Sequence, residues 1–295
     1  MPKRIVLDVD TGIDDALAIL YAVRHPELEL LGITCVAGNV ALDQVVINSC
    51  KVLDAADVTD IPIAAGAAGP LIERSRRKTS AHGPDGLAGI QLPQTSRRPS
   101  SLHAVQLLHQ LIMTSAEPVS LVTLAPKTNI ALLLRRHPDL AARIAQIIFM
   151  GGSVRPGTAE FNVWQDPEAA AYVIESSTST VMYGLDMFDQ LVVAQPIIDR
   201  FGVHDHPAIR LTGELLSRRS ALLGDAGALV LLTHPELFVT EELAVRIELE
   251  GARRGQSIVG RGSPADAGPR VWVALDLDVA KAASAFVETI NTYAA

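Results

Sequence analysis

The chain has 295 residues, of which 48% are hydrophobic and 20% are charged, and its formal net charge is −8. This is enough apolar material for one large buried core and too much for a disordered chain. The acidic balance and the 4% aromatic content disfavour a nucleic-acid partner, which needs a basic face or aromatic stacking platforms. Two cysteines, Cys35 and Cys50, are too few for a disulfide framework, and we expect buried thiols.

The first ten residues, MPKRIVLDVD, bring acidic residues before any apolar stretch of signal-peptide length. Elsewhere the sequence lacks an apolar run of about 18 residues, the length that spans a bilayer. We therefore expect a cytoplasmic protein that has no membrane partner.

Short apolar runs rich in β-branched residues alternate with longer segments of helical periodicity. The expected strands are residues 4–9, 30–37, 119–124, 144–150 and 180–185, and the expected helices are residues 14–24, 43–56, 102–114, 129–136 and 167–176. Because polar residues do not alternate strictly within the apolar runs, each run predicts a strand covered on both faces. The alternating order predicts an α/β fold in a single domain over residues 1–295, with a mostly parallel, doubly wound, Rossmann-like sheet flanked by helices.

Two segments lie outside this alternation. Residues 66–101 are rich in Gly, Pro, Ser and Arg and predict a long surface excursion, and the Gly-rich residues 253–269 predict a hairpin. Residues 279–293 predict a closing helix.

Four acidic residues lie within eight positions directly after the first expected strand: Asp8, Asp10, Asp14 and Asp15. Asp8 and Asp10 alternate along a strand and should share one face, and Asp14 is expected to be the N-cap of the next helix. Two carboxylates about 4 Å apart repel each other by about 4 kcal/mol at an effective dielectric constant near 20. Because this loop carries no Lys or Arg, a hard divalent cation with oxygen ligands is the simplest compensation. Zinc is disfavoured, since cysteine and paired histidine ligands are absent here.

The segment DVDTGIDDALAIL (8–20) resembles the N-terminal signature of the inosine–uridine-type nucleoside hydrolases. Further blocks resemble that family in the same order along nearly the whole chain: VAGNV (36–40), HGPDGL (82–87), LVTLAPKTNIA (121–131), FMGGS (149–153), AEFNVWQDPEAA (159–170), GLD (184–186) and GDAGALVLLTHPELF (224–238). The ordered set is far more specific than the first motif alone.

The resemblance implies one Ca²⁺ at the floor of the active site. Asp10, Asp15 and Asp225 match the family's carboxylate ligands, and Leu124 matches the residue that contributes a backbone carbonyl. Water and the 2′- and 3′-hydroxyls of ribose would complete a shell of six to eight oxygens, as calcium prefers. Asp10 also matches the residue that accepts a proton from the attacking water.

The resemblance also implies a ribose-binding side. Asp14 matches a partner of the 2′-hydroxyl that also suits the catalytic transition state electrostatically, and Asn39, Glu160 and Asn162 match residues that position the sugar. The implied reaction is Ca²⁺-dependent hydrolysis of the N-glycosidic bond of a small-molecule ribonucleoside to free base and ribose, through an oxocarbenium-like transition state. A homodimer or homotetramer is implied as well.

The part of the site that should contact the base departs from the family pattern. Gly224 stands where many members carry a histidine associated with protonation of the leaving base, and the stretch between residue 216 and Asp225 is shorter than the family's base-covering helix segment. His82 is the expected catalytic replacement. Restoring the histidine, as Gly224→His, is expected to raise turnover of purine nucleosides.

Two alternative functions stay open. Gly224 also fits a non-catalytic, or altered-specificity, paralogue that binds ribose or nucleosides. The run Asp8-Val9-Asp10-Thr11 fits a haloacid-dehalogenase-type phosphatase with Asp8 as the nucleophile and Mg²⁺ as the metal, but that assignment leaves Asp14 and Asp15 without a role.

Overall fold

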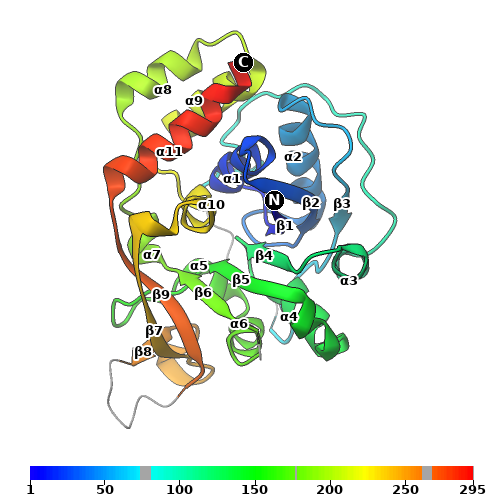
Figure 1. The fold of residues 1–295 in the computed structure, drawn as a ribbon, viewed down its shortest axis with the longest axis vertical. Coiled ribbons are helices and arrows are strands. Elements are labelled where there is room, and N and C mark those ends of the chain that lie inside the picture. Colours follow the sequence, from blue (N-terminus) through cyan, green and yellow to red (C-terminus); the bar gives the residue numbers. More distant parts are fainter. Residues whose placement is uncertain (74–80, 177, 261–267, 295) are drawn as a thin grey trace.

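The structure is a computed structural model that describes residues 1–73, 81–176, 178–260 and 268–294. Within these residues nine strands form one sheet in the order β3-β2-β1-β4-β5-β6-β9-β7-β8 (Figure 1). The strands are β1 (Lys3–Val9), β2 (Leu28–Cys35), β3 (Ile63–Ala65), β4 (Val119–Thr123), β5 (Ile144–Met150), β6 (Thr180–Tyr183), β7 (Phe238–Ile247), β8 (Ser257–Gly260) and β9 (Arg270–Leu277). The run from β3 to β9 is parallel, and β7 is antiparallel to both β8 and β9. The predicted α/β class and the mostly parallel sheet are confirmed.

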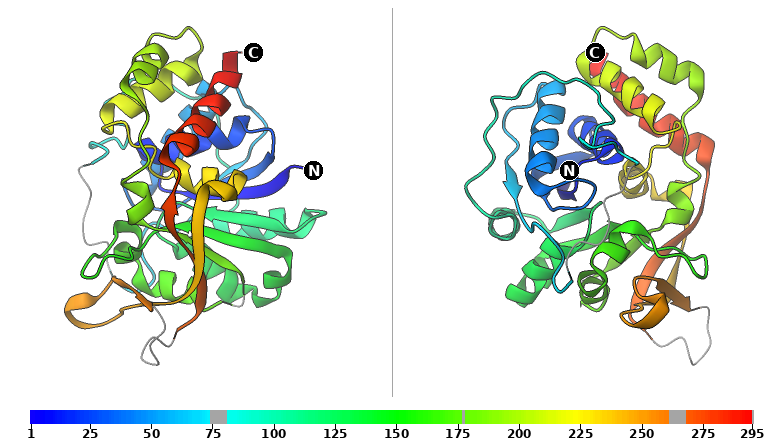
Figure 2. Two further views of the ribbon diagram at one scale, coloured as in Figure 1. Left: turned by 60° about the vertical axis from the view of Figure 1, so that its left-hand side comes forward. Right: turned by 180° about the vertical axis from the view of Figure 1, so that it is seen from behind.

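Helices cover both faces of the sheet. They are α1 (Ile13–Arg24), α2 (Leu42–Ala55), α3 (Ala104–Thr114), α4 (Thr128–Arg136), α5 (Phe161–Gln165), α6 (Pro167–Ile174), α7 (Leu185–Phe188), α8 (Gln195–Gly202), α9 (Pro207–Arg218), α10 (Ala226–Thr233) and α11 (Val279–Asn291), with short 3₁₀ turns η1 (Pro138–Arg143), η2 (Pro235–Leu237), η3 (Gly251–Arg253) and η4 (Thr292–Ala294). Helices α8, α9 and α11 gather at one end of the molecule, and the β7–β8 hairpin projects at the other (Figure 2).

Strand β1 shows why the apolar runs of the sequence form strands that are covered on both faces. Ile5, Leu7 and Val9 are buried in the core that contains α1, α2, α10 and α11, whereas Val6 is buried on the opposite side against α3 and α4. A strand covered on both faces needs apolar side chains at successive positions, and the burial of β1 and of all five residues of β4 fits that rule.

The order of the strands creates a switch point beside β1. Its neighbours are β2 on one side and β4 on the other, so the connections that leave the carboxyl ends of β1 and β4 diverge. Ligands of open α/β sheets bind in the crevice formed at such a point. The acidic segment after β1 and Leu124 after β4 therefore meet at this edge.

Helix α10 carries another acidic residue to the same edge. All eight of its residues are buried, as expected for a helix that is apolar on every side, and it packs on α1 and α11. Asp225 directly precedes it and is 4% exposed.

Some local predictions are wrong. Helix α1 begins at Ile13 with Gly12 as the N-cap, and the carboxylate of Asp15, rather than that of Asp14, accepts the Gly12 amide at 2.9 Å. The 66–101 segment is not only a surface excursion, because His82, Leu87 and Ile90 are buried; residues 74–80 lie outside the described part.

The C-terminal predictions are confirmed in part. Of the predicted hairpin range 253–269, the structure describes 253–260 and 268–269, which include β8; β8 pairs with β7, a strand that lies before the predicted range. The closing helix is α11. Among the described residues, none of the helices is long and apolar enough to cross a membrane.

Candidate active site

A cavity of about 200 Å³ lies at the carboxyl edge of the sheet, at the switch point. Its lining includes seven of the residues selected from the sequence: Asp14, Asn39, His82, Leu124, Glu160, Asn162 and Asp225. Asp10 and Asp15 are buried beside them, at 1% and 0% exposure. Segments that are more than 200 residues apart in the chain thus converge on one small space.

Three of the acidic residues form one cluster, which contains Asp14 in place of the predicted ligand Asp10. Carboxylate oxygens of Asp14, Asp15 and Asp225 all lie within 4.8 Å of one another. Asp14 Oδ1 is buried and has no hydrogen-bond partner among the described residues. This is the arrangement in which a hard cation, with oxygen ligands on several sides, replaces missing donors.

Burial and mutual repulsion shift the protonation of this cluster. Desolvation first, and then the charge of Asp14, raise the pKa of Asp15 to about 7. Desolvation and the neighbouring carboxylates also raise the pKa values of Asp10 and Asp225 well above the usual range. The protein alone therefore does not neutralise these acids fully, and the donor set fits a divalent cation.

Asn39 holds Asp10 in place. The Asn39 backbone N–H donates to Asp10 Oδ2 at 2.7 Å, and its side-chain amide donates to Asp10 Oδ1 at 3.1 Å. Gly38 makes this close approach feasible, because a Cβ there would lie 1.9 Å from Asp10 Oδ2. Asn39, which was predicted to position the sugar, thus also orients Asp10, the predicted acceptor of the water proton.

Glu160 and Asn162 build the wall after β5. Glu160 caps α5, and its carboxylate accepts the N–H groups of Gly152, Asn162 and Val163 at 2.8–3.1 Å. The Asn162 side chain donates to the carbonyl of Leu124 at 2.7 Å, so this predicted metal-ligand carbonyl already has one partner. A carbonyl oxygen has a second lone pair that can still bind a cation.

Lys127 is a site residue that the sequence did not reveal. It is 1% exposed, its ammonium donates to the carbonyls of Ala125 and Met150, and desolvation lowers its pKa to about 8 despite the opposing charges of Glu160 and Asp225. A lysine shortly after a strand is ordinarily exposed, so the only available signal was its place inside the LAPKTN block.

His82 reaches the cavity from the long excursion. Its Nδ1 accepts the backbone N–H of Ile13 at 3.1 Å, so its ring proton is on Nε2 and the ring is neutral. Asp14 Oδ1 lies 3.5 Å from the same Nδ1, yet burial is the dominant effect and lowers the pKa of His82. A neutral, buried imidazole is a poor proton donor, so the geometry does not favour His82 as the acid for the leaving base.

Asp8 is not available as a nucleophile. Its Oδ1 accepts Thr34 Oγ1 at 2.7 Å and the Asn129 amide at 2.8 Å, and its Oδ2 lies 3.4 Å from Thr123 Oγ1. Burial raises its pKa to about 6. The phosphatase hypothesis, which needs a reactive Asp8 facing the cavity, is therefore wrong.

Gly224 leaves no room for a side chain. Its φ is +55°, and a Cβ at this position would lie 2.6 Å from Asp14 Cβ and 2.8 Å from a ring carbon of Phe188. The geometry opposes the expectation that a histidine here would raise purine turnover.

We expect Gly224→His, and Gly224→Ala to a smaller degree, to lower both the melting temperature and ribose release. The left-handed backbone alone costs a non-glycine residue about 1–2 kcal/mol, and the clash pushes Asp14 out of position. Gly69→Ala is the matched control, because a Cβ there meets nothing within 4 Å among the described residues. Thermal unfolding and a reducing-sugar assay measure both effects; a Gly224→His variant with higher turnover would contradict the steric argument.

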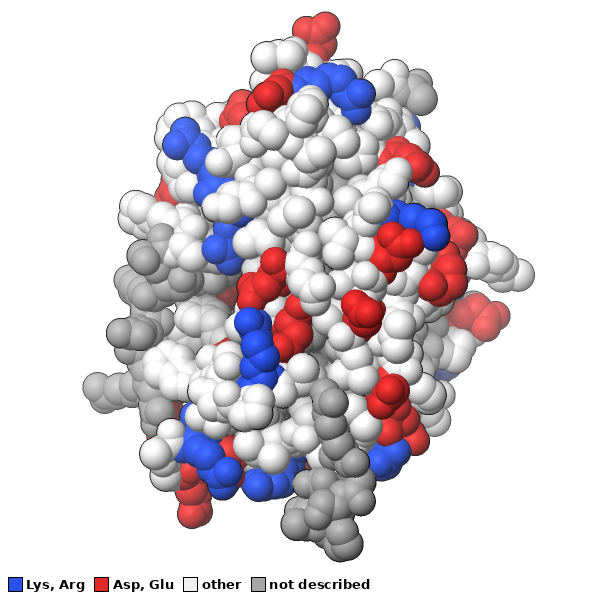
Figure 3. Space-filling view, turned by 90° about the vertical axis from the view of Figure 1, so that its left-hand side faces the viewer, with Lys and Arg blue, Asp and Glu red and all other residues white. Residues whose placement is uncertain are grey.

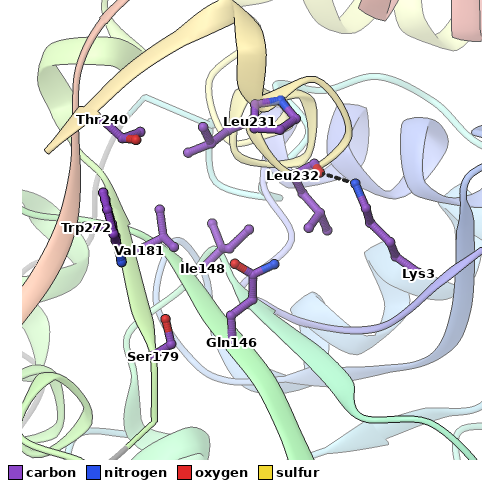
Figure 4. A pocket seen from close by; sticks show the side chains of 10 residues that line it. Lys3, Gln146, Ile148, Ser179, Val181, Leu231, Leu232, Thr240 and Trp272 are labelled. Atoms are coloured by element: carbon purple, nitrogen blue, oxygen red, sulfur yellow. Dashed lines mark hydrogen bonds between the residues drawn. The ribbon is translucent and has the colours of Figure 1, made fainter. Parts of the chain in front are cut away.

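Another cavity, of about 340 Å³, lies near the amino-terminal ends of β1, β5 and β6 (Figure 4). Its lining is mostly apolar, and Lys3, the one charged residue among the described residues of this lining, donates to the carbonyl of Leu232 at 2.8 Å. The described lining offers no carboxylate, so the chemistry is assigned to the acidic cavity.

The face in Figure 3 carries acidic and basic side chains in mixture, with basic groups beside red carboxylates. That mixture fits a small-molecule enzyme better than a surface built for a polyanion.

Comparison with known proteins agrees with this geometry. The family described as inosine-uridine preferring nucleoside hydrolase matches residues 5–284. A pyrimidine-specific ribonucleoside hydrolase, RihA, of Shigella boydii is 36% identical over 94% of this chain and 95% of its own, and a non-specific ribonucleoside hydrolase, RihC, of Salmonella agona is 37% identical over 93% and 94%. The purine-preferring ribonucleoside hydrolase from Gardnerella vaginalis superposes with a TM-score of 0.91 at 26% identity, and the match covers 99% of each chain.

Proposed function

Because the chain belongs to the inosine-uridine preferring nucleoside hydrolase family, we propose that it is a Ca²⁺-dependent enzyme that hydrolyses the N-glycosidic bond of ribonucleosides to free base and ribose. The observation that carries the proposal is the buried carboxylate cluster at the switch point, in which Asp14 Oδ1 has no hydrogen-bond partner among the described residues.

Asp10, Asp15 and Asp225, with the carbonyl of Leu124, would hold the cation. Asp14 is an additional candidate ligand, because its carboxylate groups with those of Asp15 and Asp225 within 4.8 Å. All of these donors are oxygens, which suits Ca²⁺ and disfavours zinc. When bound, the ion would hold the vicinal hydroxyls of ribose and make a water more acidic.

Asp10 accepts the proton of the attacking water. In the ion-free protein, burial and the charge of Asp15 raise its pKa well above the usual range. As a deprotonated ligand beside the water held by the ion, its carboxylate would be placed to take that water's proton. The two hydrogen bonds from Asn39 fix its orientation, so the carboxylate does not have to reorganise during the reaction.

Asp14, Asn39, Glu160 and Asn162 position the ribose. All four line the cavity, and each is at most 7% exposed. Rigid, buried partners hold the sugar with its C1′ open to water, and the negative charge of Asp14 and Glu160 stabilises the positive charge that develops on the ring.

A panel of ribonucleosides assayed for reducing sugar, with Ca²⁺ and with a chelator, tests the proposal. We expect ribose release that chelation abolishes and added Ca²⁺ restores. Binding of Ca²⁺ and ribose without release from any nucleoside would overturn it in favour of the non-catalytic paralogue.

The base preference does not follow from the relatives, whose names describe pyrimidine-specific, non-specific and purine-preferring enzymes. Homodimeric or homotetrameric assembly, a cytoplasmic location and the absence of nucleic-acid and membrane partners stay predictions from the sequence.

A further inference from the structure

Under the proposed function, a group in the site must stabilise the base as it leaves. Gly224 has no side chain, and His82 is neutral because its Nδ1 accepts a backbone N–H. Neither residue delivers a proton easily, although cleavage of the C1′–N bond pushes an electron pair onto the base.

Arg219 supplies a positive charge to the cavity lining. It directly follows α9, lines the cavity together with Leu185 and Phe188, and its guanidinium carbon lies 5.6 Å from the centre of the Phe188 ring. These residues belong to the part of the lining that was not matched to ribose or to the ion. Among the described residues that line the cavity, Arg219 is the one with a permanent positive charge.

The guanidinium of Arg219 has N–H donors that a ligand could use. One of its terminal nitrogens lies 3.4 Å from Asp14 Oδ2, while its buried Nε has no hydrogen-bond partner among the described residues. The Arg219 side chain is 22% exposed, so its charge is only partly screened by solvent. An arginine carries five N–H donors, which leaves several for a ligand.

We propose that Arg219 is a catalytic residue that binds the leaving base as an anion, a role that rests on the proposed hydrolase activity. The C1′–N bond breaks and its electron pair stays on the base nitrogen, while Arg219 donates hydrogen bonds to the heteroaromatic anion. Water adds to C1′ and gives one proton to Asp10, and solvent later protonates the released base. Atoms and charge balance without a protein acid.

This role selects a class of substrate. Arginine keeps its proton at any ordinary pH, so it stabilises charge but does not transfer a proton. The enzyme therefore favours ribosides whose leaving group forms a stable anion, such as bases whose ring carbonyl groups spread the negative charge. Cytidine, whose base forms a less stable anion, should be a poorer substrate than uridine.

A purely positioning role gives a different pattern. If Arg219 acted only by orienting Asp14, every riboside would lose activity equally when it is replaced, because all of them share the same ribose contacts. If it binds the leaving group, the loss depends on how much help that group needs.

The test compares Arg219→Met with wild type on a nucleoside series and on p-nitrophenyl β-D-ribofuranoside, an activated riboside. We expect kcat/KM to fall by about 10²–10³-fold on uridine and inosine, the size seen when one preorganised donor is removed, and only a few-fold on the activated riboside. The dependence of log(kcat/KM) on leaving-group pKa should become steeper.

The control is Arg218→Met, which removes an exposed neighbouring arginine and should leave kcat/KM unchanged. Arg219→Lys, which keeps the charge in a smaller group, should fall between wild type and Arg219→Met and covers the case in which the methionine variant does not fold. Equal losses on all ribosides would overturn the leaving-group role of Arg219 but leave the proposed hydrolase function in place. A wild-type protein that releases ribose from neither class would overturn the proposed function and, with it, this role.

Discussion

Replacing Asp10 with asparagine is expected to remove nearly all ribose release, lowering kcat by about 10²–10⁴-fold through loss of the general base, with a further loss if the ion is held less tightly. The substitution keeps the size of the side chain, and the Asn39 backbone N–H can still donate to an amide oxygen at the position of Asp10 Oδ2. The assay is initial-rate release of reducing sugar at saturating nucleoside and Ca²⁺.

Asp60→Asn is the matched control for that experiment, because Asp60 is exposed and is not one of the residues that line the cavity. Thermal unfolding separates a catalytic defect from a folding defect, since Asp10→Asn should not melt at a lower temperature than wild type. Near-normal turnover in the variant would show that another group accepts the proton.

The sheet could be predicted because a strand that is buried on both faces appears in the sequence as a continuous apolar run. Strands such as β4, in which all five residues are buried, must be apolar at successive positions, and only the ends of the elements shifted by a few residues. The antiparallel β7 was not predicted. Its burial pattern is mixed, with exposed Glu241 and Glu242 in the middle, so its sequence does not form a continuous apolar run.

Within the site, the residues that the sequence could bring into view are those in contiguous motifs. Asp10, Asp14 and Asp15 share one turn, whereas Arg219 contacts Asp14 across 205 positions of sequence, and nothing local to Arg219 reveals that contact. Lys127 was missed for a related reason, because it donates to carbonyls of Ala125, after β4, and of Met150, at the end of β5, which meet only in the folded sheet. The wrong N-cap shows the same limit, since both Asp14 and Asp15 have the right chemistry for a cap.

The ion-free protein is expected to lose stability as the pH rises from about 5 to 8. Burial raises the pKa of Asp15 to about 7 and that of Asp8 to about 6, whereas these carboxyls titrate near 4 in the unfolded chain. Between those values the folded protein binds more protons than the unfolded chain, so the free energy of unfolding falls with pH. Each pKa unit of difference is worth about 1.4 kcal/mol, and the penalty is complete once the pH exceeds the folded pKa.

Calcium should reverse this trend, because an ion that binds only the folded state adds about 2.7 kcal/mol of stability at a concentration of 100 times its Kd. We expect the melting temperature to fall with pH in chelator but to stay level or rise with pH in Ca²⁺, since the ligands must lose their protons to bind. Asp15→Asn removes one ligand charge and should flatten the pH dependence in chelator while weakening the response to Ca²⁺. Melting curves in chelator and in Ca²⁺ that coincide from pH 5 to 8 would contradict a cation site at this cluster, because an ion that binds only the folded state must stabilise it.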